Sequence, residues 1–281
     1  MNQQTMSLLP DPDLPQGSRS LTVTRYRDGQ YVQAPDLVAE ECPVALVFNG
    51  ISHAVMMATP LDLVHFAIGF ALSEGIVSRR EDIYDVEVLP GCEGITVQLD
   101  IAQPAFQALK SRRRALTGRT GCGVCGIESL SMLDLNPPLI SRYKQPFMLS
   151  PQAITLAGEQ LRREQQLMAQ TGGVHAAAWC DLTGDVLQVF EDVGRHNALD
   201  KILGFIADQR VDVRSGFVFM SSRASYELVR KAARFQLPLL ATISAPSALA
   251  VRMAESSGMY LLSFCRSHGF VSYGREFSIC T

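Results

Sequence analysis

Hydrophobic positions in the first half of the chain repeat with the period of strands and then with that of helices. Two apolar runs in CPVALVFNGISHAVMMAT (42–59) flank Asn49-Gly50, a pair that favours the tight turn of a β-hairpin. TPLDLVHFAIGFALSEG (59–75) has helical spacing and predicts a buried helix. Strands over YDVEVL and GITVQLDI and a helix over AFQALKSRRRAL follow. This pattern predicts an α+β region over residues 21–145, after a polar, proline-rich and mobile tail at 1–20.

The pattern changes beyond the proline-rich segment DLNPPLISRYKQPF, which is the best candidate linker. After a helical stretch, VHAAAWC and DVLQVFED form strands that pair around Thr183-Gly184, and helices then alternate with the strands GFVFMSS, LPLLATISA and MYLLSFC. Such alternation predicts right-handed crossovers and a largely parallel sheet with helices on both faces. We assign this α/β domain to residues 146–281.

Composition narrows the class of protein. The chain has 281 residues, of which 47% are hydrophobic and 19% charged, as in a soluble globular protein. It contains no apolar run long enough to span a bilayer, and its N-terminus lacks the features of a signal peptide, so we expect a cytoplasmic protein with no membrane partner. The net charge of −3 argues against a globally basic nucleic-acid binder.

Polar side chains gather at three strand ends of the predicted sheet, within SSRAS, SAPSA and FCRSHG. Parallel strands bring such ends to one edge, which is where open α/β sheets bind ligands. Hydroxyls, helix N-termini and arginines suit a phosphate, although serines and prolines there also cap helices. The sequence predicts a phosphate or nucleotide site that includes Ser222, Arg223, Arg266 and His268.

A further polar group, EDVGRHNALDK, lies where a strand passes into a helix. This motif has two interpretations. A carboxylate of Glu191 or Asp192 beside Arg195 and His196 could form an acid–base or ligand-binding group, or these residues could be helix caps and local ion pairs. His175 is expected to be a packed strand residue.

The segment GRTGCGVCG (118–126) places Cys122 and Cys125 in a glycine-rich loop. Seven dispersed cysteines indicate a reducing compartment, so this close pair needs a chemical reason. Residues 101–127 carry five Lys and Arg and no acid before Glu128, which favours the thiolate form. The pair suits an incomplete zinc site, a redox dithiol or a nucleophile that carries sulfur as a persulfide.

Four segments together resemble one family, the formate dehydrogenase accessory sulfurtransferases (FdhD family). They are RRRALTGRTGCGVCG, EDVGRH, SSRASYE and the hairpin-plus-helix segment from Val47 to Ile76. The resemblance extends from about residue 38 over nearly the whole chain. It implies a homodimeric maturation factor that takes sulfur from a cysteine desulfurase and passes it to the molybdenum cofactor, bis-molybdopterin guanine dinucleotide, before insertion into formate dehydrogenase.

The resemblance also assigns roles to residues. It implies that Cys122 forms the persulfide and that Cys125 assists. Because one cysteine pair lacks the ligands to close a tetrahedral site, we expect no bound zinc. The resemblance places a cofactor-binding segment at Phe264, Cys265, Arg266, Ser267, His268 and Gly269, where the Ser-His-Gly run departs from the family's Pro-Gly-Arg. It implies a cytidine-deaminase-like αβα domain, although the zinc signature of the deaminases is absent from this chain.

One function of a different class competes with sulfur transfer. In a non-catalytic zinc-binding chaperone or scaffold, Cys122 and Cys125 would close a structural zinc site together with ligands distant in the sequence.

Overall fold

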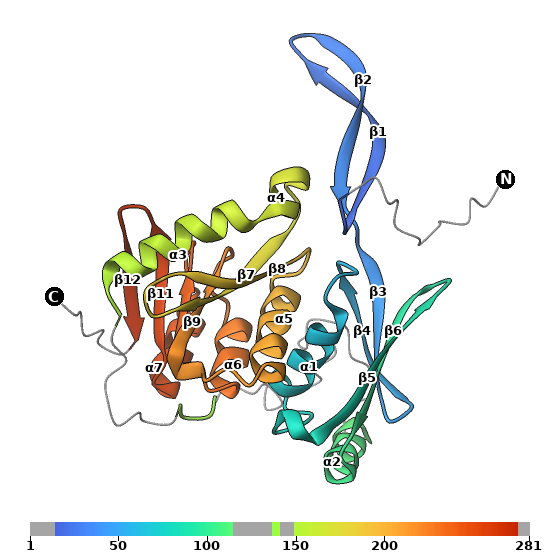
Figure 1. The fold of residues 1–281 in the computed structure, drawn as a ribbon, viewed down its shortest axis with the longest axis vertical. Coiled ribbons are helices and arrows are strands. Elements are labelled where there is room, and N and C mark those ends of the chain that lie inside the picture. Colours follow the sequence, from blue (N-terminus) through green and yellow to red (C-terminus); the bar gives the residue numbers. More distant parts are fainter. Residues whose placement is uncertain (1–14, 115–136, 141–148, 275–281) are drawn as a thin grey trace.

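The computed structural model describes residues 15–114, 137–140 and 149–274 (Figure 1). The predicted boundary between the two regions, at 145/146, and the predicted loop 118–126 lie outside the described residues. The strands are β1 (Ser18–Arg27), β2 (Gln30–Ala39), β3 (Cys42–Phe48), β4 (Ile51–Ala58), β5 (Ile83–Gly91), β6 (Gly94–Ile101), β7 (His175–Asp181), β8 (Val186–Asp192), β9 (Gly216–Met220), β10 (Leu239–Thr242), β11 (Tyr260–Arg266) and β12 (Gly269–Gly274). The α-helices are α1 (Leu63–Ser73), α2 (Gln103–Arg114), α3 (Pro151–Glu164), α4 (Gln166–Thr171), α5 (Arg195–Asp208), α6 (Tyr226–Arg234) and α7 (Ala248–Ser257).

The N-terminal region is built on a four-stranded sheet of order β4-β3-β6-β5, which confirms both hairpins predicted there. Residues of β3 alternate between buried and partly exposed, as expected for a strand with one face on a core. Its buried residues Val44, Leu46 and Phe48 pack with α1 and with Phe106 of α2 in one hydrophobic cluster.

A six-stranded sheet of order β12-β11-β10-β9-β7-β8 forms the second region. Alternate strand residues face two separate cores: Phe217 and Phe219 pack against α3, whereas Val218 and Met220 pack against α5, α6 and α7. The region therefore has three layers, helix, sheet and helices, which can be followed in Figure 1. Its likeness to cytidine deaminases stays a prediction.

The sheet is mixed, which corrects the expectation of a largely parallel one. Among the described strands of this sheet, β9, β10 and β11 pair in parallel, whereas the pairs β7–β8, β7–β9 and β11–β12 are antiparallel. The sequence analysis did not predict β12. A strand that returns through a short turn needs no crossover helix, so the alternation of strands and helices does not reveal it.

A two-stranded hairpin of β1 and β2 projects from the body as an arm (Figure 1). Ser18–Ser20, which the sequence assigned to the tail, belong to β1. Asp28 and Gly29 form its turn with φ values of 52° and 82°, the left-handed conformation that a type I′ turn requires. The turn of the arm thus has an Asp-Gly pair, which favours a tight turn as the Asn49-Gly50 pair of the β3–β4 hairpin does.

Helices α1 and α5 join the two regions through a close glycine contact. A Cβ atom on Gly69 would overlap the carbonyl oxygen of Asp200, and one on Gly204 would overlap that of His65. Glycine at both positions lets the helix backbones touch.

Buried charges reinforce this junction. Lys231 Nζ of α6 lies 2.8 Å from Asp200 Oδ2 of α5 and 2.9 Å from Glu74 Oε1 after α1. Burial raises the pKa of Asp200, whereas Asp200 and Glu74 raise the pKa of Lys231 against the opposing effect of burial.

Among the described residues, none of the helices combines the length and apolar character needed to cross a bilayer.

Candidate functional site

One edge of the six-stranded sheet collects the chemically active side chains. Because β9, β10 and β11 are parallel and β8 is antiparallel to β7, the carboxyl ends of β8 to β11 all reach this edge. Helices α5, α6 and α7 begin directly beyond the first three of these ends. Their N-termini bring the positive ends of three helix dipoles to one side of the sheet.

Backbone hydrogen bonds hold the predicted strand-end loops together. The amide of Ala224 donates to the carbonyl of Ala245 at 3.2 Å, and the amide of Ser247 donates to the carbonyl of Ala224 at 2.9 Å. The amide of Phe264 donates to the carbonyl of Ser244 at 3.3 Å. The three loops predicted from the sequence are therefore neighbours in the structure.

Two serines of these loops act as helix caps. Ser225 Oγ accepts a hydrogen bond from the Leu228 amide, and Ser247 Oγ accepts one from the Ala250 amide. Ser222 is buried, with its hydroxyl donating to the carbonyl of Arg223, while the Arg223 side chain is exposed. Of this group, Arg223 and Ser247 are exposed at the edge.

The first turns of α5 and α6 meet at His196. Its Nε2 atom lies 2.7 Å from Glu227 Oε2 and 3.5 Å from Ser225 Oγ. Although burial opposes it, the hydrogen bond from His196 and the positive charges of His196 and Arg195 lower the pKa of Glu227. Glu227 is thus an ionised partner that orients the imidazole.

His175, at the start of β7, belongs to the same cluster. Burial lowers the pKa of its imidazole, and the nearby charges of Arg195 and His196 lower it further. As predicted, His175 is a partly buried strand residue, and the pairing of β7 with β8 sets it opposite Asp192 at the edge. A neutral imidazole among cations is suited to accept a proton when an anion binds.

The two acids predicted beside His196 stabilise the fold. Asp192 is buried and lies 2.8 Å from Lys201 Nζ, and it accepts hydrogen bonds from the Thr59 and Gly194 amides. Both carboxylate oxygens of Glu191 accept bonds from the first amides of α4. Both acids therefore fit the interpretation of this motif as helix caps and local ion pairs rather than as an acid–base group.

The segment Phe264–Gly269 is a β-hairpin and not a loop beyond a strand. Strand β11 runs on through Arg266, the turn falls at Ser267-His268, and β12 begins at Gly269. An irregularity in the pairing between Ser263 and Arg266 coincides with a positive φ of 55° at Phe264. Cys265 is buried, and burial raises the pKa of its thiol to about 12, so this cysteine stays protonated.

Arg266 and Ser267 line a cavity of about 340 Å³ between this hairpin and α3. Arg162 and Arg163 of α3 line it from the other side, with Glu159 as the acidic residue of the lining. Arg266, Ser267 and His268 are exposed. The excess of arginine suits an anionic ligand.

Cys122 and Cys125 lie outside the described residues. The cysteines that the structure describes are different in character: Cys42, Cys180 and Cys265 are buried with raised pKa values, and Cys92 is exposed. Within the described part of the chain, no three His, Cys, Asp or Glu residues gather as metal ligands would.

The fold and the edge define a three-layer α/β protein with a cationic sheet edge, attached to an α+β region. The chain belongs to the FdhD/NarQ family, whose model matches residues 39–280.

Relatives with assigned names cover nearly the whole chain. A protein of Chromobacterium violaceum named sulfur carrier protein FdhD is 62% identical over 92% of this chain and 96% of its own. A protein of the same name from Acinetobacter baylyi is 49% identical over 96% of this chain and 98% of its own.

A crystal structure from Desulfotalea psychrophila, described as a candidate formate dehydrogenase accessory protein, shares the fold. Its TM-score is 0.70 at 24% identity, over 92% of this chain and 97% of that one.

Proposed function

We propose that this protein is a sulfur carrier that supports the maturation of formate dehydrogenase. The observation that carries the proposal is the 62% identity, over 92% of the chain, with a protein named as a sulfur carrier. The glycine-rich, basic segment around Cys122 and Cys125 supplies the residue types that such a carrier needs. Because these thiols must stay reduced, the proposal locates the transfer in the cytoplasm.

Loading needs no oxidant. The Cys122 thiolate attacks the outer sulfur of a persulfide on a cysteine desulfurase, a new S–S bond forms, and the donor cysteine leaves as a thiolate. The product is a persulfide on Cys122. The cations of residues 101–127 favour the attacking thiolate.

Cys125 provides a route for release. Its thiolate attacks Cys122 Sγ, a Cys122–Cys125 disulfide forms, and the outer sulfur departs as hydrosulfide with the electron pair of the broken bond. The hydrosulfide becomes a ligand of the molybdenum in the acceptor. A cellular dithiol then reduces the disulfide and restores the carrier.

The acceptor in this proposal is bis-molybdopterin guanine dinucleotide, bound as substrate. Its phosphates suit the edge where Arg195, His175 and Arg223 meet the N-termini of α5 and α6. The arginine-lined cavity beside Arg266 offers a second anionic position.

Complementation tests the proposal with a matched control. In cells that lack their own carrier, Cys122→Ala should leave a co-expressed formate dehydrogenase inactive, and Cys125→Ala should retain part of the activity. Cys92→Ala alters an exposed cysteine in the described part of the chain and should behave as wild type. Full activity with Cys122→Ala would contradict the proposal.

The zinc scaffold remains the alternative from a different class. Metal analysis of protein purified without chelator separates the two. About one zinc per chain, lost together with folding on chelation, would favour the scaffold.

A further inference from the structure

The outer edge of strand β8 is a feature that the sulfur-transfer proposal does not use. β8 is the last strand of the six-stranded sheet and pairs with β7 along its inner side. Proteins usually protect such an edge with lysine, proline or a covering element, because its backbone groups can pair with another chain. The sequence of β8 is VLQVFED, which contains neither lysine nor proline. The strand therefore lacks the side chains that usually prevent a further strand from pairing.

The backbone of β8 at Val189 faces away from β7. The carbonyl of Ala176, opposite Glu191, accepts a hydrogen bond from the Ser221 amide and so points to the other side of β7. The backbone groups of Glu191 then point outward as well, and those of Val189, two residues earlier, share this direction. The Val189 carbonyl accepts a hydrogen bond from the side-chain amide of Gln188 at 3.2 Å. The backbone amide of an incoming strand can replace this side chain.

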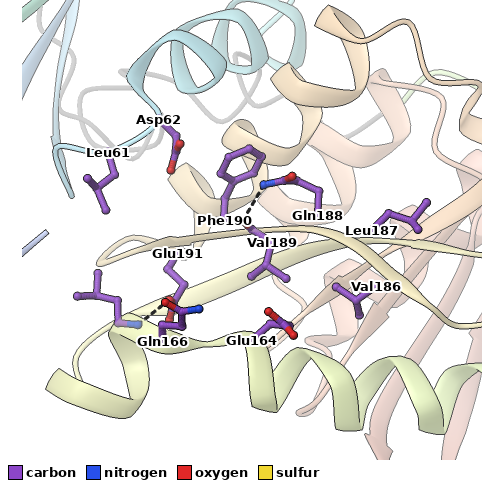
Figure 2. Close-up of a pocket in the computed structure, with 11 residues that line it drawn as sticks. Leu61, Asp62, Glu164, Gln166, Val186, Leu187, Gln188, Val189, Phe190 and Glu191 are labelled. Carbon is purple, nitrogen blue, oxygen red and sulfur yellow. Dashed lines mark hydrogen bonds between the residues drawn. The ribbon is translucent and has the colours of Figure 1, made fainter. Parts of the chain in front are cut away.

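A groove of about 360 Å³ follows the same edge (Figure 2). All residues of β8 from Val186 to Glu191 line it, a length of about 20 Å at 3.3 Å per residue. Leu61 and Asp62, which precede α1, form one side of the groove, and Glu164 and Gln166, from α3 and α4, form the other. The groove thus has the length and direction of an extended peptide.

The lining of the groove is acidic and apolar. Among the described residues that line it, none is lysine, arginine or histidine. Asp62 and Glu164 are exposed and lie on opposite sides of the β8 residues in Figure 2. The Glu191 carboxylate already accepts the first amides of α4, and Leu187 adds an apolar side chain that is 59% exposed. This lining is complementary to a segment that carries both basic and apolar side chains.

We propose that the outer edge of β8 binds an extended, basic peptide segment of a partner protein as an additional strand. The segment pairs with the backbone at Val189 in place of the Gln188 side chain. Its basic side chains lie near Asp62 and Glu164, and its apolar side chains cover Leu187. In strand addition, main-chain hydrogen bonds give affinity and alternate side chains give specificity. This surface differs from the cationic sheet edge, and the inference does not depend on sulfur transfer.

Fluorescence anisotropy with a labelled seven-residue peptide of alternating lysine and valine tests the proposal on the full-length chain. The peptide should bind, and binding should weaken as salt rises. The same peptide with N-methylated backbone amides, and a peptide with glutamate in place of lysine, should each bind about tenfold more weakly or worse. No binding of the lysine–valine peptide, as expected if a second copy covers the groove, would overturn the proposal. Equal binding of either control peptide would also overturn it.

Charge removal tests whether the peptide lies in this groove. Asp62→Asn together with Glu164→Gln should weaken binding about tenfold, the scale of two exposed ion pairs. Asp85→Asn together with Glu87→Gln removes two exposed acids from β5, an edge strand of the four-stranded sheet, and should leave the affinity unchanged. Equal losses in the two double variants would show a general attraction to acidic surface and would overturn the groove assignment.

A proline substitution tests strand pairing from the protein side. Proline is tolerated on an edge strand where its missing N–H would face outward. Val189→Pro should weaken peptide binding about tenfold, whereas Val189→Ala, which keeps the amide, should change it less than about twofold. Circular dichroism checks the fold of both variants, and the N-methylated peptide decides the same point if Val189→Pro does not fold. Equal losses in the two folded variants would overturn pairing along β8.

Discussion

His196 Nε2 lies 2.7 Å from Glu227 Oε2, and this contact fixes the first turn of α5 against the first turn of α6. Both helices begin at the edge where the strand ends meet, so the contact also sets the position of Arg195 beside His175. A cation, a neutral imidazole and two helix N-termini are thereby held in one place before any ligand arrives.

Free GDP should bind at this edge, and binding should weaken as salt rises. Arg195→Ala should reduce the affinity by about 1–3 kcal/mol, the scale of a hydrogen bond to a charged group. Titration calorimetry at two salt concentrations measures both effects. Arg79→Ala removes a 73% exposed arginine paired with Asp82 and should leave the affinity unchanged. Equal losses in the two variants would contradict a specific site.

His175 should make the free protein less stable in acid. Its folded-state pKa lies below the ordinary value of 6.5, so below that pH the unfolded chain binds a proton that the folded chain does not. Stability should therefore fall as pH decreases from 6.5 towards the folded pKa, with a slope of at most about 1.4 kcal/mol per pH unit. Denaturant titrations across this range should give a flatter profile for His175→Gln. An unchanged profile would refute the assignment.

Lys231 should be essential to the junction of the two regions. Its ammonium contacts Asp200 and Glu74, and Lys231→Met would leave the buried Asp200 without its counter-charge. We expect a loss of about 3–5 kcal/mol in the free energy of unfolding, measured by denaturant titration. Arg214→Ala, in an exposed pair with Asp212, should cost less than about 1 kcal/mol. Comparable losses in both variants would count against a special role for the buried cluster.

Gly204 tests the close approach of α1 and α5. Gly204→Ala forces a methyl group onto the His65 carbonyl, and we expect a loss of about 3 kcal/mol or more, seen as a lower midpoint of unfolding. Gly173→Ala has room for its methyl group and serves as the control. A Gly204→Ala variant as stable as the control would mean that the helices separate readily.

Local signals in the sequence were sufficient for most elements. Asn49-Gly50 marked the β3–β4 hairpin, and the apolar spacing of 59–75 marked α1. The arm was missed although Asp28-Gly29 between alternating segments carries the same signal, because the polar start of the chain was read as a tail that included Ser18–Ser20.

The ligand-binding edge was predictable only in part. Strand direction brought Ser221–Ser225 and Ser244–Ala248 together as expected. His175 was correctly expected in a strand, but its place at the edge depends also on the pairing of β7 with β9, which local signals do not reveal. The sequence did not predict that Phe264–Gly269 forms a hairpin. A hairpin and a loop after a strand have similar sequences, and the pairing of β11 with β12 is what distinguishes the hairpin. Long-range pairing such as that of β7 with β9 leaves little trace in local periodicity.

The central claim, that Cys122 carries sulfur, is tested most directly by mass spectrometry after incubation with a cysteine desulfurase and cysteine. The wild-type protein should gain one sulfur atom on the peptide that contains GRTGCGVCG, and Cys125→Ala should retain part of this gain. Cys122→Ala should show no gain while keeping its fold and its affinity for GDP. Sulfur loading of Cys122→Ala together with none on Cys125→Ala would reverse the two roles, and no loading of the wild-type loop would contradict the account.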